Sequence, residues 1–131
     1  MRLLPLFLVI AACSPEAAPP AQEKATYAGQ GRDQLCLDGD RAGFIAYREG
    51  DANCSVRGRV EPIGEGRLSI IPDGDEDCRI EAARQSDRIS LGARSGACAY
   101  YCGPGADFTG KAFAKRDSTS PAVDFAGDPL C

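Results

Sequence analysis

Seven cysteines are the side chains of this 131-residue chain with the widest choice of chemistry. They are Cys13, Cys36, Cys54, Cys78, Cys98, Cys102 and Cys131. Cysteines pair into disulfides in oxidising compartments, bind metal ions as thiolates or act as nucleophiles. No two of them have the Cys-x-x-Cys spacing that is typical of zinc sites and redox catalysts. Disulfides are therefore favoured, and an odd number leaves one cysteine whose role needs another explanation.

Histidine is absent from the chain, and its absence restricts the chemistry that the protein can perform. Histidine is the commonest general base and a common metal ligand, so Ser/His/Asp and Cys/His nucleophilic sites are excluded. Paired carboxylates can hydrolyse glycosides, but the chain contains no tryptophan to stack against a sugar. The sequence therefore predicts a protein that is not an enzyme, has no catalytic residues and needs no cofactor. A hydrolase is the disfavoured alternative.

The densest acidic group is the sequence DGDED at residues 73–77. Its alternating carboxylates Asp73, Asp75 and Asp77 resemble the first half of a calcium-binding loop, because hard cations prefer several oxygen ligands. The EF-hand pattern also requires a glutamate at the twelfth loop position, which is Arg84 when the loop is counted from Asp73. The pattern therefore favours a solvated turn, with calcium as the alternative and no metal expected.

The sequence SGACAYYC at residues 95–102 predicts a short helix. Cys98 and Cys102 are four residues apart, so one helical turn places them on the same face. A disulfide between cysteines this close would close a very short loop and add little stability. We therefore expect Cys98 and Cys102 to bond to different partners. The alternative is a surface redox pair. Tyr100 and Tyr101 form a candidate binding surface, because tyrosine on a rigid turn is a good anchor. Alternatively, one tyrosine packs inward and the other covers the surface.

The N-terminus has the layout of an export signal. Arg2 is followed by an apolar run at residues 3–10 and by two small residues before Cys13. An apolar run of about ten residues is too short to span a bilayer as a helix, which needs ~20. The next residues, 14–24, are rich in proline, alanine and glutamate, which is typical of a spacer.

The end of this signal resembles the lipobox of bacterial lipoproteins, in which an aliphatic residue and two small residues precede a cysteine. The matching residues are Ile10, Ala11, Ala12 and Cys13. The resemblance covers residues 1–13 and implies that the Cys13 thiol receives a diacylglycerol, that the signal is cut before Cys13 and that the new amine is acylated. Two or more acyl chains, such as palmitate, anchor a protein stably in a membrane. By the same resemblance, Ser14 in place of aspartate favours the outer membrane.

Lipidation of Cys13 leaves an even set of six cysteines, which we expect to form three disulfides in an oxidising periplasm. The expected organisation is a signal peptide at residues 1–12, a flexible tether at 13–30 and one disulfide-rich β domain at 31–131. The formal net charge of −4 and the scattered arginines favour solubility and argue against a nucleic-acid partner.

Short segments with period-two alternation predict that the domain is mainly β. The predicted strands cover residues 34–37, 42–48, 54–61, 68–71, 78–82 and 88–91. Their regular spacing favours a small antiparallel meander that closes into a barrel or a sandwich, stapled by disulfides, with one short helix near 95–102. Residues 107–114 are compatible with either a helical turn or a short strand.

These features predict a lipid-anchored protein of the cell envelope that faces the periplasm, with a non-enzymatic binding or accessory role. Its expected partners are the membrane, through the lipid on Cys13, and a periplasmic or envelope protein. The alternative is a small anchored inhibitor of a lysozyme-like hydrolase, by analogy of size, address and architecture.

Overall fold

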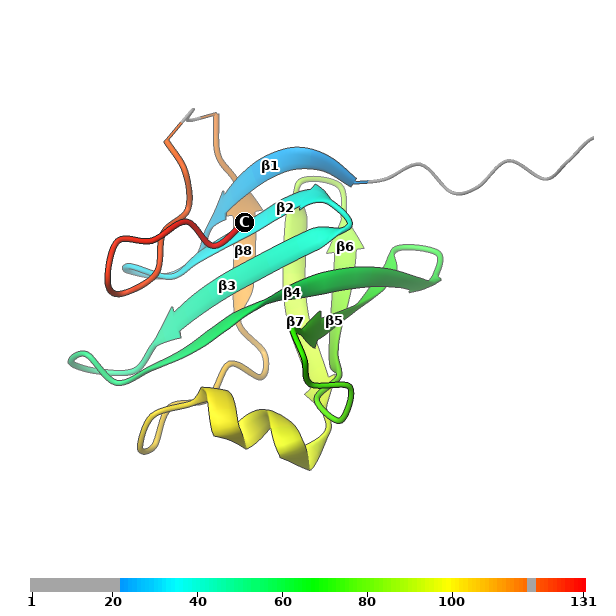
Figure 1. Cartoon of the computed structure of the whole chain (residues 1–131). Helices are drawn as coiled ribbons and strands as arrows, with labels where there is room; N and C mark the ends of the chain where they lie inside the picture. Colours follow the sequence, from blue (N-terminus) through cyan, green and yellow to red (C-terminus); the bar gives the residue numbers. More distant parts are fainter. Residues whose placement is uncertain (1–21, 118–119) are drawn as a thin grey trace, which may run out of the picture.

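The structure, a computed structural model, describes residues 22–117 and 120–131 (Figure 1). The expected signal peptide, the lipidation site Cys13 and the first part of the tether, 13–21, lie outside the described residues. Within the described ranges, no helix combines the length and the apolar character needed to cross a bilayer.

In the described part of the chain, eight antiparallel strands form a closed barrel in which each strand pairs with its neighbour in sequence. The strands are β1 (Gln22–Ala28), β2 (Gln34–Gly39), β3 (Arg41–Tyr47), β4 (Asn53–Gly64), β5 (Arg67–Pro72), β6 (Ile80–Gln85), β7 (Arg88–Arg94) and β8 (Ala112–Lys115). β1 and β8 close the barrel, with Tyr27 opposite Lys115 and Ala28 opposite Ala114. The prediction of a mainly β, antiparallel meander is confirmed, and the meander closes as a barrel.

The sequence-based boundary between tether and domain requires a correction. The segments predicted as strands overlap β2 to β7, but β1 lies within the segment 13–30 that was expected to be a tether. Ala25 and Tyr27 of β1 are buried in the barrel, so the folded domain extends at least to Gln22. The segment 107–114 was compatible with a helical turn or a strand, and its last three residues form part of strand β8.

Side chains that alternate along the strands fill the barrel interior. In β4, Cys54, Val56 and Val60 are buried, whereas Arg57 between them is exposed, as the period-two pattern predicts. Gly58 occupies the inward-facing position between Val56 and Val60, and a side chain there would clash with β5. A Cβ at this position would lie 1.9 Å from the carbonyl oxygen of Ile71, so only glycine allows β4 and β5 to approach this closely.

The connections divide between two rims of the barrel. One rim, here called the long-loop rim, carries the loops 29–33, 48–52, 73–79 and 95–111. The other, the short-turn rim, carries the turns at residues 40, 65–66 and 86–87. β1 begins at the short-turn rim, and Figure 1 shows its start well apart from the helix at the long-loop rim.

The C-terminal residues 120–131, here called the strap, cover the outer face of β2 and β3. Ile45 of β3 points out of the barrel but is fully buried, because it packs with Cys36 and with Ala122 and Leu130 of the strap. The strap ends in a disulfide between Cys131 and Cys36. It therefore shields an apolar patch that a bare barrel would expose to water.

Candidate functional site

The loop 95–111, here called the lid, crosses the long-loop rim and contains the 3-10 helix η1 (Gly96–Tyr101). Ser95 joins the lid to the loop 73–79, because its Oγ accepts the backbone N–H of Arg79 (3.0 Å) and donates to the carbonyl of Asp77 (2.6 Å). Phe108 inserts from the lid into the core and packs edge-to-face on Phe44, with 5.1 Å between ring centroids. The lid is thus a packed part of the domain.

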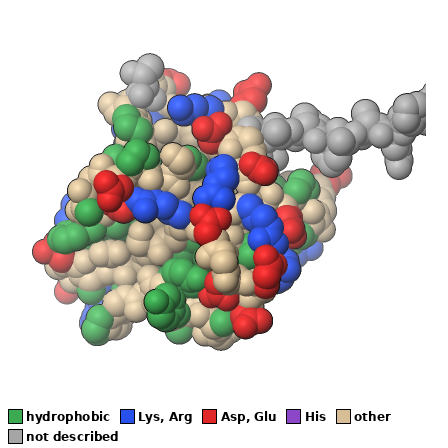
Figure 2. All heavy atoms as spheres, in the orientation of Figure 1, with side chains coloured by type: hydrophobic (Ala, Val, Ile, Leu, Met, Phe, Trp, Pro, Cys, Tyr) green, Lys and Arg blue, Asp and Glu red, His purple; other side chains and the backbone are tan. Residues whose placement is uncertain are grey.

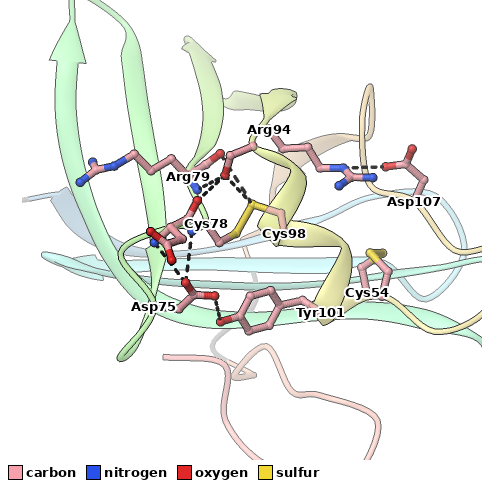
Figure 3. The surroundings of a disulfide bond; sticks show 11 residues. Cys54, Asp75, Cys78, Arg79, Arg94, Cys98, Tyr101 and Asp107 are labelled. Atoms are coloured by element: carbon pink, nitrogen blue, oxygen red, sulfur yellow. Dashed lines mark hydrogen bonds and ion pairs between the residues drawn. A yellow bond between two sulfur atoms is a disulfide. The ribbon is translucent and has the colours of Figure 1, made fainter.

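Two disulfides hold the lid to the barrel. Cys98 bonds to Cys78, in the loop 73–79 that precedes β6 (Figure 3). Cys102 bonds to Cys54 in β4. The expectation that the two lid cysteines bond to different partners is confirmed, whereas the placement of both on one helical face is wrong. A 3-10 helix has about three residues per turn, and η1 ends before Cys102, which is extended and pairs with Cys54.

The two tyrosines of the lid have different surroundings. The Tyr101 hydroxyl donates a hydrogen bond to Asp75 Oδ2 at 2.7 Å (Figure 3). Burial, together with the neighbouring Asp75 carboxylate, raises the pKa of Tyr101 to about 12. Tyr100 is 86% exposed and lies edge-to-face with Tyr101. Tyr101 therefore helps to hold the lid in place, whereas Tyr100 is exposed to solvent on a lid that two disulfides fix.

The candidate calcium ligands have separate protein partners. Asp73 forms two hydrogen bonds with the guanidinium of Arg41, at 2.7 and 2.6 Å. Asp75 accepts the Tyr101 hydroxyl and the backbone N–H groups of Asp77 and Cys78, and these bonds lower the pKa of its carboxyl. The structure does not bring Asp73, Asp75 and Asp77 together, and among the described residues no group of three or more acidic or cysteine side chains could hold a metal ion.

An alternating charge network lies beside these residues on the outer face of the barrel. Arg59 contacts Glu76 (2.7 Å) and Glu61 (3.2 Å), and Arg79 contacts the same two carboxylates. The Arg59 guanidinium lowers the pKa of Glu76. Figure 2 shows Lys/Arg and Asp/Glu side chains adjacent to one another on this face. Because these side chains are exposed to solvent, each ion pair contributes little to the stability of the fold.

An open groove of about 490 Å³ lies at the same rim, beside the lid. The loop residues 30–33, residues 47–50 and Lys111 of the lid line it. None of these residues was selected from the sequence. The only signal is the glycine-rich stretch before Asp33, which marks a turn but no chemistry.

A buried carboxylate organises the groove. Asp33 is 3% exposed, accepts the backbone N–H of Tyr47 at 2.7 Å and lies 3.5 Å from Lys111 Nζ. Lys111 also donates to the carbonyl of Tyr47 at 3.3 Å. A buried charge without a partner is strongly destabilising, so Lys111 and Asp33 hold each other in place across the groove.

The two arginines of the groove differ in their contacts. Arg32 lies 4.0 Å from the Tyr47 ring centroid and binds the carbonyl of Gly50 and the carboxylate of Asp51. Arg48 forms no ion pair within the described part of the chain. Its guanidinium rests on the lid in the space that a Cβ of Gly105 would occupy, 1.9 Å from that position.

Comparisons with protein-family models, with curated proteins and with solved structures find no match to this chain.

Proposed function

We propose that this chain is a lipid-anchored protein of the bacterial cell envelope whose domain binds a partner protein at the long-loop rim, without catalysing a reaction. The observation that carries the proposal is the lid, in which two disulfides hold Tyr100 in an 86% exposed position. The resemblance to a lipobox at residues 10–13 supports the proposed location in the cell envelope. The disulfides support it too, because disulfides are typical of oxidising compartments.

The lid has the physical properties of a binding anchor. Tyrosine is enriched among the residues that dominate interface energies, because its ring buries a large area and its hydroxyl forms hydrogen bonds. Ordering a loop on binding opposes association, and a loop that is already fixed avoids this loss. The Cys78–Cys98 disulfide and the Tyr101–Asp75 hydrogen bond fix the lid before any partner binds.

The alternative, an anchored inhibitor of a lysozyme-like hydrolase, receives support from the architecture. The sequence suggested this class by analogy with small lipid-anchored inhibitors that are disulfide-tied β-barrels, and the chain forms a closed barrel with three disulfides among its described cysteines. Inhibition of a lysozyme by the purified chain, measured as slower lysis of cell walls, distinguishes this alternative from a non-inhibitory binding protein.

The anchoring part of the proposal is tested at Cys13. Mass spectrometry of the membrane-extracted protein should show an acylated N-terminal cysteine and no residues 1–12. The Cys13→Ala variant should be released from the membrane or remain unprocessed. A Cys13→Ala protein that stays membrane-bound with the wild-type mass would refute the lipobox.

The binding part is tested by capture from envelope extracts with the full chain as bait. A partner should be retained by the wild type and lost from Tyr100→Ala. Ile63→Ala is the matched control, because Ile63 is 42% exposed at the end of β4, near the short-turn rim. Equal capture by the Tyr100→Ala and wild-type proteins would rule out the lid as the contact surface.

A further inference from the structure

The groove beside the lid contains cations of unequal availability. Arg32 is already bound to Gly50 and Asp51, and Lys111 is bound to Asp33 and the Tyr47 carbonyl. Arg48 lines the same groove and has no acidic partner among the described residues. An arginine guanidinium carries its charge at every physiological pH and presents paired N–H donors in one plane. Of the three cations that line the groove, Arg48 is therefore the one without an acidic partner among the described residues.

The backbone leaves space for a ligand next to this donor. Gly31 and Gly50, on the two loops that line the groove, have φ values of +58° and +79°. No atom lies within 4 Å of the position that a Cβ would take at either glycine. The space on this side of both glycines is therefore open to a bound molecule, as is common where a chain approaches a ligand closely.

We propose that this groove binds the carboxylate of a small extracytoplasmic molecule, with Arg48 as the primary contact and Lys111 as a second donor. The geometry of a guanidinium matches a carboxylate, which accepts two parallel hydrogen bonds. The groove lining contains three cationic side chains, Arg32, Arg48 and Lys111, and two acidic ones, Asp33 and Glu49. The excess of a single positive charge suits a monoanion better than a phosphate dianion.

The position of Arg48 is set by the lid. Its guanidinium lies against Gly105, whose φ of +70° and missing side chain create the space. Because Cys102 joins the lid to β4 three residues earlier, the same covalent tie that fixes the lid also fixes the surface on which Arg48 rests. The surface beneath Arg48 is therefore fixed before the ligand binds, and a site with fixed surroundings loses less entropy on binding.

Two sources of carboxylate are distinguished by the choice of probe. The full-length chain, purified in detergent, is titrated with acetyl-alanyl-alanine and with its C-terminal amide, and separately with glucuronate and with glucose. Inorganic phosphate is the third anion. Calorimetry gives the dissociation constants, and the backbone amide shifts of Gly31 and Gly50 report where the probe binds. Binding of the free peptide acid but not its amide identifies a peptide C-terminus, and preference for glucuronate over glucose identifies an acidic sugar.

Arg48→Gln should weaken binding of the carboxylate about tenfold or more, because it removes a charge-assisted pair of hydrogen bonds. Arg88→Gln is the matched control: it makes the same change at an exposed arginine that begins β7 at the short-turn rim, and it should leave the dissociation constant unchanged. The proposal is overturned if no carboxylate binds, if phosphate binds more tightly, or if Arg48→Gln binds as well as the wild type.

The carboxylate site and the proposed partner surface are tested separately. Tyr100→Ala should leave carboxylate binding unchanged, because Tyr100 does not line the groove. Failure of the capture experiment would therefore refute the lid contact and leave the groove to be decided by its own titration.

Discussion

At the scale of single residues, Asp75 links the lid to the barrel. Its carboxylate accepts the Tyr101 hydroxyl and two backbone N–H groups, and these bonds lower its pKa. A carboxyl whose pKa is lower in the folded state stabilises the fold above its ordinary pKa, and this contribution disappears as the pH falls through the folded-state pKa. The attachment of the lid through Asp75 is therefore complete at neutral pH and weakens in acid.

Tyr101→Phe should raise the pKa of Asp75 towards its ordinary value, because the largest cause of the lowering is the Tyr101 hydrogen bond. The backbone donors of Asp77 and Cys78 remain, so we expect a partial return. A carbon-13 NMR titration of the carboxyl groups measures the change. Tyr100→Phe is the control and should leave the Asp75 titration in place. An Asp75 midpoint that does not move in Tyr101→Phe would show that the hydrogen bond is absent in solution.

At the scale of elements, the strap and β3 fit because Gly43 has no side chain. The carbonyl oxygen of Leu130 lies 2.1 Å from the position of a Cβ at Gly43. Gly43 faces outward between the inward-facing Ala42 and Phe44, so the barrel interior does not require a glycine there. Close contact with the strap is the structural reason for this residue.

Gly43→Ala should displace the strap and lower the free energy of unfolding by about 1–3 kcal/mol, the usual range for overpacking. Limited proteolysis should then cut within 120–131 faster than in the wild type, while the barrel stays folded by circular dichroism. Gly96→Ala is the control, because no atom lies within 4 Å of a Cβ at that position. Unchanged proteolysis and stability in Gly43→Ala would contradict the observed packing of the strap.

The pattern of strands shows what the sequence encodes locally. β4 was predictable because its buried and exposed residues alternate over a long run. β1 was not, because its few buried side chains follow a stretch of proline and alanine. In addition, one of its two neighbouring strands, β8, is far away in sequence. The adjacent Phe44 and Ile45 are both buried, which signals cover on both faces of β3, but nothing local indicates that the strap supplies the cover.

At the scale of the whole molecule, one disulfide fixes the C-terminal residue and two fix the lid. Cys36–Cys131 closes a sequence separation of 95 residues, and Cys78–Cys98 one of 20 residues. Cross-links stabilise chiefly by restricting the unfolded chain, and the effect grows slowly with loop length. The sequence predicted three disulfides from the cysteine count, but the pairing depends on which strands become neighbours and could not be read from spacing.

A thiol titration of the denatured, unreduced protein should find no free thiol among the six cysteines after Cys13. Replacing Cys78 and Cys98 together with alanine should lower the free energy of unfolding by ~3 kcal/mol, as expected for a loop of that length. Chemical denaturation measures the loss. Two or more free thiols per chain would refute the disulfide framework and restore a redox or metal role for the lid cysteines.

The groove shows the limit of sequence reasoning at this scale. Asp33, Arg48 and Lys111 belong to three different loops, and only closure of the barrel brings them to one rim. None of them lies in a motif, and charged residues in turns are common on any soluble surface. The burial of Asp33 and its ion pair with Lys111 are properties of the folded chain.

A meander that closes after an even number of strands returns to the rim from which it started, so β1 begins and β8 ends on the same side of the barrel. The four loops of the opposite rim are therefore topologically independent of the chain that leads into the barrel. The exposed parts of those loops, such as residues 49–51, can therefore vary in sequence without altering strand order or closure. The parity of the strand count therefore separates the rim with the long loops from the rim at which the described chain enters the barrel.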